Sequence, residues 1–415
     1  MNSVIAYVGE EPTSKGVATV TGPGSTWHST SISVGESGPG TLYVQNGGLV
    51  DVTSIAVTAQ GTVNLNGGTL RLDNPNAISG FDRINFNYGT VELTGDRTVG
   101  LDADIGGLFG AGPTIAVREA LNVDGTATLA TALTLDGGAF TASAIAGSAK
   151  LQLLHGTLNI TNQALTVGPS GNLASSLDLA SDMTVSSALG ITNQGLVTGD
   201  GQIGGTFANA ATGELRAEPG HSLTLTGANN TNAGRINLLG GELEFTQNLT
   251  NSFGGLVSGN GSLITHTGLL NQGTMNFGGT MNILGDVTNA AGGKIISAGG
   301  GATIFFDDVN NQGEIRTSTN GFSVFFGTVS GAGTFTGTGT VNFEGDLTPG
   351  NSPASVRFGG DVSFGADAAL KIEISGSTPG SGYDQLVVSG DLALDGALSV
   401  TMLPGFTPAA GQSFN

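Results

Sequence analysis

Apolar and polar residues alternate along most of this chain, in short runs that are separated by glycine and asparagine. Two such runs, GTLYVQNGGLVDV at 40–52 and QGTVNLNGGTLRL at 60–72, repeat one pattern and place Asn46 and Asn66 20 residues apart. A period of two is typical of β-strands that bury one face. Glycine and asparagine supply the backbone conformations that tight turns need. The pattern therefore predicts an all-β chain of short strands and turns.

A repeat of about 20 residues runs through much of the rest of the chain. Apolar pairs keep this spacing, so that FFDDV at 305–309 aligns with FFGTV at 325–329. Asparagine followed by glycine and a new alternating run recurs with the same mean spacing, at Asn193, Asn209, Asn232, Asn251, Asn271, Asn289 and Asn311. Repeats this short, made only of strands and turns, are typical of a β-solenoid, in which each repeat is one coil and neighbouring coils pair in parallel sheets. We therefore expect roughly 17 coils, with Phe305 and Phe325 in contact.

The recurring asparagines are predicted to occupy the corners of the coils. Asparagine tolerates a left-handed backbone, and its side-chain amide can bond to the same amide of the next coil, as in stacked amide ladders. Glycine follows because a corner needs a positive φ. Asn46 and Asn66 are assigned to corners for the same reason. These residues are expected to have a structural role and no catalytic or binding role.

The pattern changes along the chain and predicts two parts. We expect a β-solenoid over 1–345, with VTGPGSTW and VGESGPGTL-type repeats at 1–75, less regular coils at 76–190 and Asn-x-Gly coils at 191–345. Longer alternating runs at 346–415 predict an antiparallel β module that caps the solenoid and is truncated. Because the first repeat begins with the chain, nothing is left to cover the first coil. The chain is thus expected to be a fragment of a longer protein, or to have its cap outside this sequence.

The composition narrows the class of protein. The chain has 415 residues with 72 glycines and 11% charged residues, but its 38% of hydrophobic residues is high for a disordered chain. It has no cysteine, which excludes disulfide bonds and thiolate metal sites. A net charge of −20 makes nucleic acid and anionic membrane surfaces poor partners. No apolar run reaches the length of a membrane span, and the N-terminus lacks the features of a signal peptide.

Two segments resemble the passenger region of bacterial autotransporters and of related surface proteins. The unit TVTGPGSTW…VGESGPGTLYVQNGG at 19–48 resembles a passenger repeat. The run LTPGNSP…ALKIEI…YDQLVVSGDLALDGALSVTMLPGFTP at 347–408 resembles the segment that ends many such passengers. The resemblance implies a secreted, right-handed parallel β-helix that is delivered to the cell surface and is often adhesive. Since the sequence holds neither a signal peptide nor an anchor, the mode of anchoring stays open.

The acidic doublet Asp307-Asp308 is the candidate for a catalytic pair. Polysaccharide lyases and hydrolases with a β-helical fold need clustered carboxylates on one exposed sheet. The positions one coil later are Gly327 and Thr328, so no second carboxylate is expected beside the doublet. We therefore expect Asp307 and Asp308 to be solvated turn residues. No catalytic, cofactor-binding or metal-binding residue is assigned.

Other residues with chemical potential stand alone in the sequence. The histidines lack the spacing of metal-binding motifs and are expected to be polar residues of the surface or the core, and not metal ligands: His28, His155, His221 and His266. Trp27 is expected to pack against the wall of the solenoid, with sugar binding as the alternative. Asp102 and Asp104 are a candidate for weak calcium binding, but ordinary solvated charge is the expected role.

These observations favour a non-enzymatic, extracellular structural or adhesive β-solenoid, secreted or held at a bacterial cell surface. Its partners would be host or environmental glycans, surfaces or other copies of itself, and no cofactor is expected. Two alternatives stay open. One is a secreted β-helical polysaccharide lyase or hydrolase, and the other is a self-assembling component of an extracellular matrix.

Overall fold

The computed structural model of the chain describes residues 1–73, 79–99, 113–147, 151–350 and 353–414. Over these residues the chain is a parallel β-solenoid of about 15 turns, with coils about 21 residues apart. The predicted all-β solenoid is confirmed, and a single 3-10 turn, η2 (Phe81–Arg83), interrupts the described strands. No helix within the described ranges has the length and apolar character needed to cross a membrane.

The coils group into two compact units, which are described separately. The first unit comprises Met1–Ile191 and Gly201–Gly205, and the second comprises Thr192–Asp200 and Thr206–Asn415. Strand β16 (Ile191–Asn193) contains the boundary between them.

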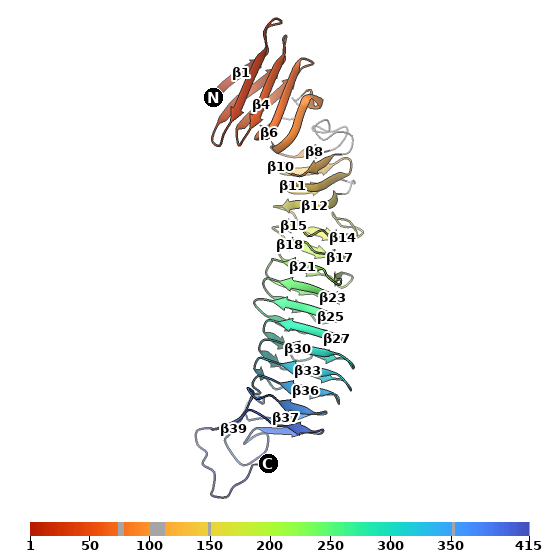
Figure 1. The fold of residues 1–415 in the computed structure, drawn as a ribbon, viewed down its shortest axis with the longest axis vertical. Helices are drawn as coiled ribbons and strands as arrows, with labels where there is room; N and C mark the ends of the chain where they lie inside the picture. The colour runs from red at the N-terminus through yellow and green to blue at the C-terminus, as the bar shows by residue number, and fades with distance from the viewer. Residues whose placement is uncertain (74–78, 100–112, 148–150, 351–352, 415) are drawn as a thin grey trace. The chain divides into compact units, whose positions relative to one another are not determined.

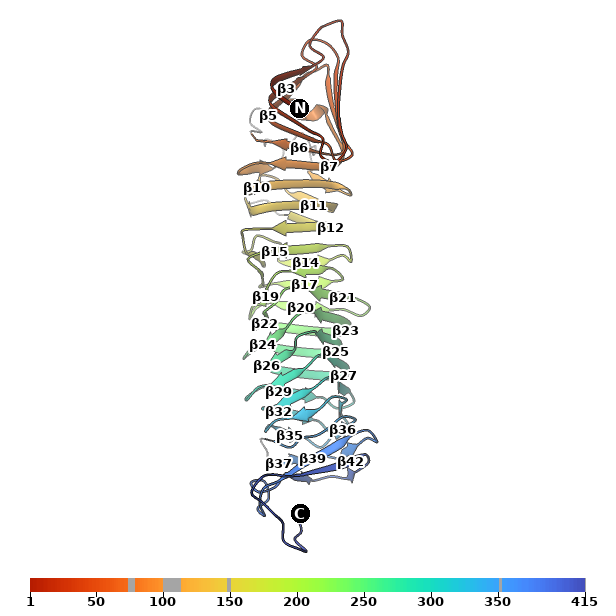
Figure 2. The ribbon, with the colours of Figure 1, turned by 90° about the vertical axis from the view of Figure 1, so that its left-hand side faces the viewer.

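The first unit is built from parallel ladders of strands. Its strands are β1 (Asn2–Val8), β2 (Gly16–Thr21), β3 (Thr26–Val34), β4 (Gly40–Gln45), β5 (Leu49–Val57), β6 (Gly61–Leu72), β7 (Ile84–Leu93), β8 (Arg97–Val99), β9 (Thr114–Ala116), β10 (Glu119–Leu129), β11 (Leu133–Ala146), β12 (Leu151–Ile160), β13 (Leu165–Val167), β14 (Ser176–Leu179), β15 (Thr184–Ser187) and β18 (Gln202–Gly204). β1, β3 and β5 pair in parallel, as do β2, β4 and β6. β6, β7, β10, β11 and β12 then follow one another in register, and Figure 2 shows them stacked.

Alternation along these strands separates a core face from an outward face. Leu70, Val91, Leu121, Phe140 and Leu158 occupy matching positions on successive strands and have 0% exposure. Each side chain of this kind contributes roughly 1.5–3 kcal/mol when it is buried. The residues on either side of them point outward, as a period of two requires. The outward face is therefore the part of this unit that is open to ligands.

The second unit repeats a coil of three strand segments. Its strands are β17 (Leu196–Gly199), β19 (Phe207–Asn209), β20 (Glu214–Ala217), β21 (Ser222–Leu225), β22 (Asn230–Asn232), β23 (Arg235–Phe245), β24 (Leu249–Asn251), β25 (Leu256–Thr265), β26 (Leu269–Asn271), β27 (Thr274–Leu284), β28 (Val287–Asn289), β29 (Lys294–Ser297), β30 (Ala302–Phe305), β31 (Val309–Asn311), β32 (Glu314–Thr317), β33 (Phe322–Phe325), β34 (Val329–Ser330), β35 (Thr334–Thr336), β36 (Thr340–Phe343), β37 (Ser355–Phe358), β38 (Val362–Phe364), β39 (Ala369–Ile374), β40 (Gln385–Val388), β41 (Leu392–Ala393) and β42 (Ala397–Met402). Figure 1 shows β23, β25, β27, β30, β33 and β36 stacked in this unit. Strands of one coil pair in parallel with those of the next, for example β24 with β26 and β26 with β28.

The predicted amide ladder is present, and it lies inside the core of the second unit. The seven recurring asparagines from Asn193 to Asn311 each end a three-residue strand and have 0–2% exposure. The side-chain Nδ2 of each of the first six donates to Oδ1 of the next asparagine at 2.7–2.8 Å. The second Nδ2 hydrogen of each goes to a backbone carbonyl of the following coil, at 2.9–3.3 Å. The buried amides are thus fully satisfied, which avoids a cost of about 1–3 kcal/mol for each unpaired group.

The predicted left-handed backbone at these asparagines is wrong. Among the described non-glycine residues, positive φ values occur at Asn46, Arg118, Asn229 and Asn320. Asn46, with φ of 49°, is therefore the single predicted corner asparagine in that conformation, and Asn66 lies within β6. The physical reason is that an extended strand points the amide into the core, where the same amide of the next coil lies directly opposite. The ladder requires strand geometry, not corner geometry.

The predicted contact between Phe305 and Phe325 is confirmed. The two residues are register partners, and their rings stack with centroids 4.8 Å apart and an angle of 8° between the planes. Phe343 and Phe364 continue the stack on the next two strands, with centroid distances of 5.5 and 5.1 Å. The core of the second unit therefore repeats in its aromatic as well as its amide side chains.

The strands at 346–415 cap the solenoid, but their predicted antiparallel pairing is wrong. β37 pairs with β40, β38 with β41 and β39 with β42, all in parallel. Antiparallel pairing in this region is limited to isolated bridges, such as Ile374 to Tyr383. The loops between the alternating runs are long enough to return the chain to the same side of the sheet. The runs therefore form wider coils, whose register partners are 28–30 residues apart.

Candidate functional site

Two hollows lie on the outward face of β7, β10, β11 and β12 in the first unit. Their volumes are about 490 and 620 Å³. Thr90, Ala120, Ala139 and Thr157 are register partners on the four strands, and their small side chains form the floor of the first hollow. The second hollow lies over the positions two residues further along three of these strands. Because side chains two apart share one face of a strand, the two hollows lie on the same face.

Arg118 and Glu119 form one wall of the first hollow, at the start of β10. Arg118 has φ of 69°, a conformation that costs a non-glycine residue about 1–2 kcal/mol. Its Cζ lies 4.2 Å from the centre of the Tyr88 ring, a cation–π contact. Among the described residues, no carboxylate pairs with the Arg118 guanidinium. A free cation is therefore held in a fixed place.

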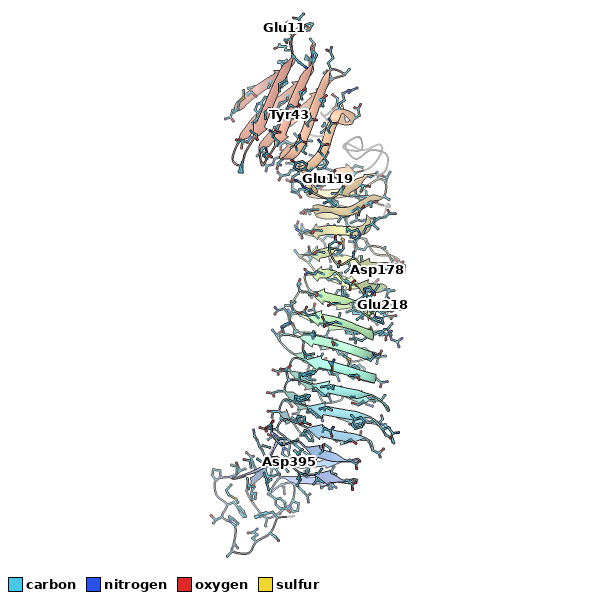
Figure 3. All side chains as sticks on the ribbon, viewed as in Figure 1. Glu11, Tyr43, Glu119, Asp178, Glu218 and Asp395 are labelled. Carbon is cyan, nitrogen blue, oxygen red and sulfur yellow. The ribbon has the colours of Figure 1, made fainter. Side chains whose placement is uncertain are left out.

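Glu119, labelled in Figure 3, is half-buried and lines the same hollow. Burial raises the pKa of Glu119, and the hydrogen bond that the Ala116 amide donates to Oε2 at 2.7 Å opposes that shift. Asp182 lines the same hollow and is exposed. The hydrogen bond with Nδ1 of His155, at 2.7 Å, lowers the pKa of Asp182 and raises that of His155. The hollow thus holds two carboxyl groups whose pKa values are shifted in opposite directions.

The second hollow is lined by Arg71, Glu92, Asn122 and Thr141. Arg71 Nη2 lies 2.7 Å from Glu92 Oε2, so this cation is neutralised within the protein. Asn122 and Thr141 are half-buried and make no side-chain hydrogen bond to another described residue. Their amide and hydroxyl groups are thus free to bond with a ligand or with water.

The four histidines are polar residues of the surface, one of the two environments predicted for them, and each has a carboxylate partner that the sequence did not indicate. Each lies 2.7–2.8 Å from a carboxylate of another coil, in the pairs His28–Asp51, His155–Asp182, His221–Asp200 and His266–Glu244. The imidazoles are 44–55% exposed, so these are surface pairs that bridge coils. The partners in all four pairs are 21–27 residues apart in the sequence, so no local spacing motif identifies them. In the part of the chain that the structure describes, no three histidine or acidic side chains group as a metal site.

Asp307 and Asp308 are exposed, as predicted for turn residues. Asp307 Oδ2 accepts a hydrogen bond from the Gly285 amide at 2.6 Å, and Asp308 Oδ1 accepts one from the Thr328 amide at 2.7 Å. Asp307 therefore bonds to the preceding coil, and Asp308 bonds to the following coil. This structural role accounts for both carboxylates.

Trp27 packs into the solenoid wall, as predicted. It is 6% exposed, and its Nε1 donates to Ser3 Oγ at 3.1 Å. The candidate calcium pair Asp102 and Asp104 lies outside the described residues.

Sequence reasoning missed Arg118, Glu119 and Asp182 as members of one site. They lie in the section where the 20-residue period is blurred, so their register could not be assigned. Register shifts between Val123 and Thr126 and between Asp136 and Ala139 explain the loss of the period. The adjacent pair Arg118-Glu119, which comes directly before an alternating run, was the signal in the sequence that could have identified one wall of the first hollow.

The fold defines this chain as a parallel β-solenoid protein. No family model matches the chain, and no curated protein matches it. Among solved structures, the "TibC-catalyzed hyper-glycosylated TibA55-350 fragment" is similar at 13% identity and a TM-score of 0.19, with 96% of this chain and 97% of that one covered. A TM-score this low means that the two chains do not superpose as wholes, and nothing about function follows from it.

Proposed function

We propose that the chain is a non-enzymatic structural or adhesive β-solenoid that works outside a bacterial cell, as a secreted or surface-held passenger. The observation that carries this proposal is the unbroken amide ladder of the second unit. Every coil that it joins is fixed to the next by buried, charge-free hydrogen bonds at 2.7–2.8 Å. Such a core favours a fixed scaffold that presents its outward faces, and the motifs at 19–48 and 347–408 favour a passenger-like role.

An adhesion assay tests the proposal. Beads that carry the purified protein should bind to epithelial cells or to a glycan array more than beads that carry a matched acidic protein of similar charge. The same preparation should release no reducing ends from a panel of polysaccharides. Adhesion equal to that of the control beads would contradict the adhesive role, and an epitope tag that stays inside cells expressing the full reading frame would contradict the location.

A second candidate function is a polysaccharide lyase or hydrolase. It is favoured by one observation, the opposite pKa shifts of Glu119 and Asp182 in the first hollow. Carboxyl groups whose pKa values are pushed apart can act as acid and base. Release of reducing ends that is abolished by Glu119→Gln, and not by Asp307→Asn, would favour the enzyme.

A third candidate function is self-assembly into a matrix. It is favoured by an exposed apolar patch on the second unit, where Phe306 and Phe326 stack with centroids 5.6 Å apart and remain 43% and 50% exposed. Exposed patches of this kind often mark contacts with other proteins. Concentration-dependent association that is lost in Phe326→Ser would favour this candidate.

A further inference from the structure

We infer that the outward face of β7, β10, β11 and β12 binds a linear oligosaccharide of neutral hexoses. We name this surface the polar face, and define it by the floor residues Thr90, Ala120, Ala139 and Thr157 and by the residues of the two hollows beside them. The inference rests on the proposed adhesive function and adds a ligand class to it.

The shape of the polar face fits an extended ligand. Successive strands lie about 4.8 Å apart, so a trough across four strands is about 14 Å long, which accommodates a few linked sugar rings. The small side chains of Ala120 and Ala139 keep its floor low. Gly138 and Gly156 beside the floor cannot be replaced by larger residues, because a Cβ would lie 2.5 Å from the carbonyl oxygen of Ala116 and 2.2 Å from that of Gly138. Neither position therefore carries a side chain that could fill the hollow.

The chemistry of the walls fits hydroxyl groups. Arg118 donates hydrogen bonds, the Glu119 and Asp182 carboxylates accept them, and Asn122 and Thr141 can do both. A sugar hydroxyl is both a donor and an acceptor, so adjacent hydroxyls can satisfy such a mixed set. Arg118, Asn122 and Thr141 lack a hydrogen-bonding side-chain partner among the described residues. The protein itself therefore leaves these groups available.

The charges of the polar face favour a neutral ligand over an anionic one. Arg71 is already paired with Glu92, which leaves Arg118 as the cation without a carboxylate partner among the described residues of the two hollows. Glu119, Asp124 and Asp182 also line the hollows. Because the chain has a net charge of −20, its electrostatic field repels a polyanionic ligand and slows its association.

A protein partner fits the polar face less well than a sugar chain. Hot spots of protein interfaces are usually large aromatic or arginine side chains seated in pockets. The floor here consists of threonine and alanine, and the backbone groups of β10 and β11 are bonded to neighbouring strands on both sides. An added β-strand therefore finds no open edge at this place.

Calorimetric titration of the full chain with cellohexaose and with maltohexaose tests the inference. We expect one of these two probes to bind the unchanged protein with a millimolar or lower Kd. Ala139→Gln places a longer side chain on the floor and should weaken binding at least about tenfold. Asn122→Leu removes one hydrogen-bonding group and should weaken it about three- to tenfold. Ala302→Gln is the control, because Ala302 is an outward strand residue of the second unit.

Each result of this experiment decides for or against the inference. Binding by neither probe, binding unchanged in Ala139→Gln while its circular dichroism spectrum is normal, or tighter binding of hexagalacturonate would overturn it. Loss of probe binding in Ala139→Gln with Ala302→Gln unaffected would support it. Failure of the inference leaves the proposed function intact if bead adhesion persists in Ala139→Gln. Shortening of the hexaoses during the titration would instead contradict the non-enzymatic function.

Discussion

The two units share one fold but hold their coils together in different ways. In the second unit, buried asparagines and stacked phenylalanines recur at matching positions of successive coils. Among the described residues of the first unit, no asparagine is buried, and the buried hydrophobic residues are mostly valine, leucine and isoleucine, with one phenylalanine, Phe140, one tryptophan, Trp27, one methionine, Met183, and two alanines. The first unit thus depends on non-directional apolar packing, and the second adds directional amide bonds and ring contacts.

The outward faces of the units differ in a related way. The two hollows of the candidate site lie on the first unit, where Arg118 and Glu119 interrupt the regular pattern. In the second unit, Asp307 and Asp308 accept hydrogen bonds from backbone amides of the adjoining coils. The comparison suggests that regular coils supply rigidity and that less regular coils supply recognition.

Truncation of a core phenylalanine in each unit gives the largest expected effect. Phe325→Ala and Phe140→Ala both remove a fully buried ring, and each should lower the free energy of unfolding by about 3–5 kcal/mol. Phe325 also loses its stacks with Phe305 and Phe343, so its loss should be larger by about 1 kcal/mol. Native-state hydrogen exchange of β33 and of β11 measures the two losses. An equal or larger loss at Phe140 would remove the distinction between the cores.

Interruption of the amide ladder should have the next largest effect. Asn251→Ala removes the bond from Asn232 and the bond to Asn271, both 2.8 Å long, and leaves a cavity. We expect a loss of about 2–4 kcal/mol in the free energy of opening of the neighbouring coils, measured by hydrogen exchange. Asn311→Ala breaks a single amide–amide bond at the end of the ladder and should cost about half as much. Equal losses at the two positions would show that the ladder does not act cooperatively.

The sequence predicted the regular part of the molecule better than the irregular part. Phe305 and Phe325 could be placed in contact because a 20-residue period assigns register without any knowledge of the turns. The burial of the asparagines could not be predicted, because a polar amide followed by glycine has the same signature at a turn and at the inward end of a strand. A ladder position differs from a turn only in having an equivalent amide in both neighbouring coils.

The candidate site could not be predicted because its members depend on register shifts. Glu119 and Asp182 are 63 residues apart, and several coils and at least three register shifts lie between them. A bulge moves every later side chain to the other face of its strand.

Replacement of Arg118 tests how the first unit tolerates strain beside its hollow. Arg118→Gly removes the cost of φ at 69°, about 1–2 kcal/mol, and loses a cation–π contact of about 0.5–1 kcal/mol. The free energy of unfolding should therefore change by less than about 1 kcal/mol. Arg118→Ala keeps the strain and loses the contact, so it should be the less stable variant in chemical denaturation. A large loss in Arg118→Gly would mean that the guanidinium supports the fold, not a ligand.

The smallest expected effect is the pH dependence of the pair between His155 and Asp182. The pKa of His155 is raised above its usual 6.5 by the hydrogen bond with Asp182, and the pKa of Asp182 is lowered below its usual 3.8 by the same bond. Because the pKa of His155 is raised, its protonated imidazole stabilises the fold. This contribution is complete below pH 6.5 and is lost as the pH rises through the raised pKa. The contribution of the Asp182 carboxylate to the stability of the fold is present above pH 3.8 and is lost as the pH falls through the lowered pKa.

His155→Gln should therefore lower the unfolding temperature at pH 5.5 by roughly one degree, because exposed pairs contribute little, and should have no effect at pH 9. Asp182→Asn should give the same loss at pH 5.5, and the double variant should lose no more than either single variant. Equal shifts at both pH values would assign the loss to packing of the imidazole, and the charge pair would then contribute nothing to holding these coils together.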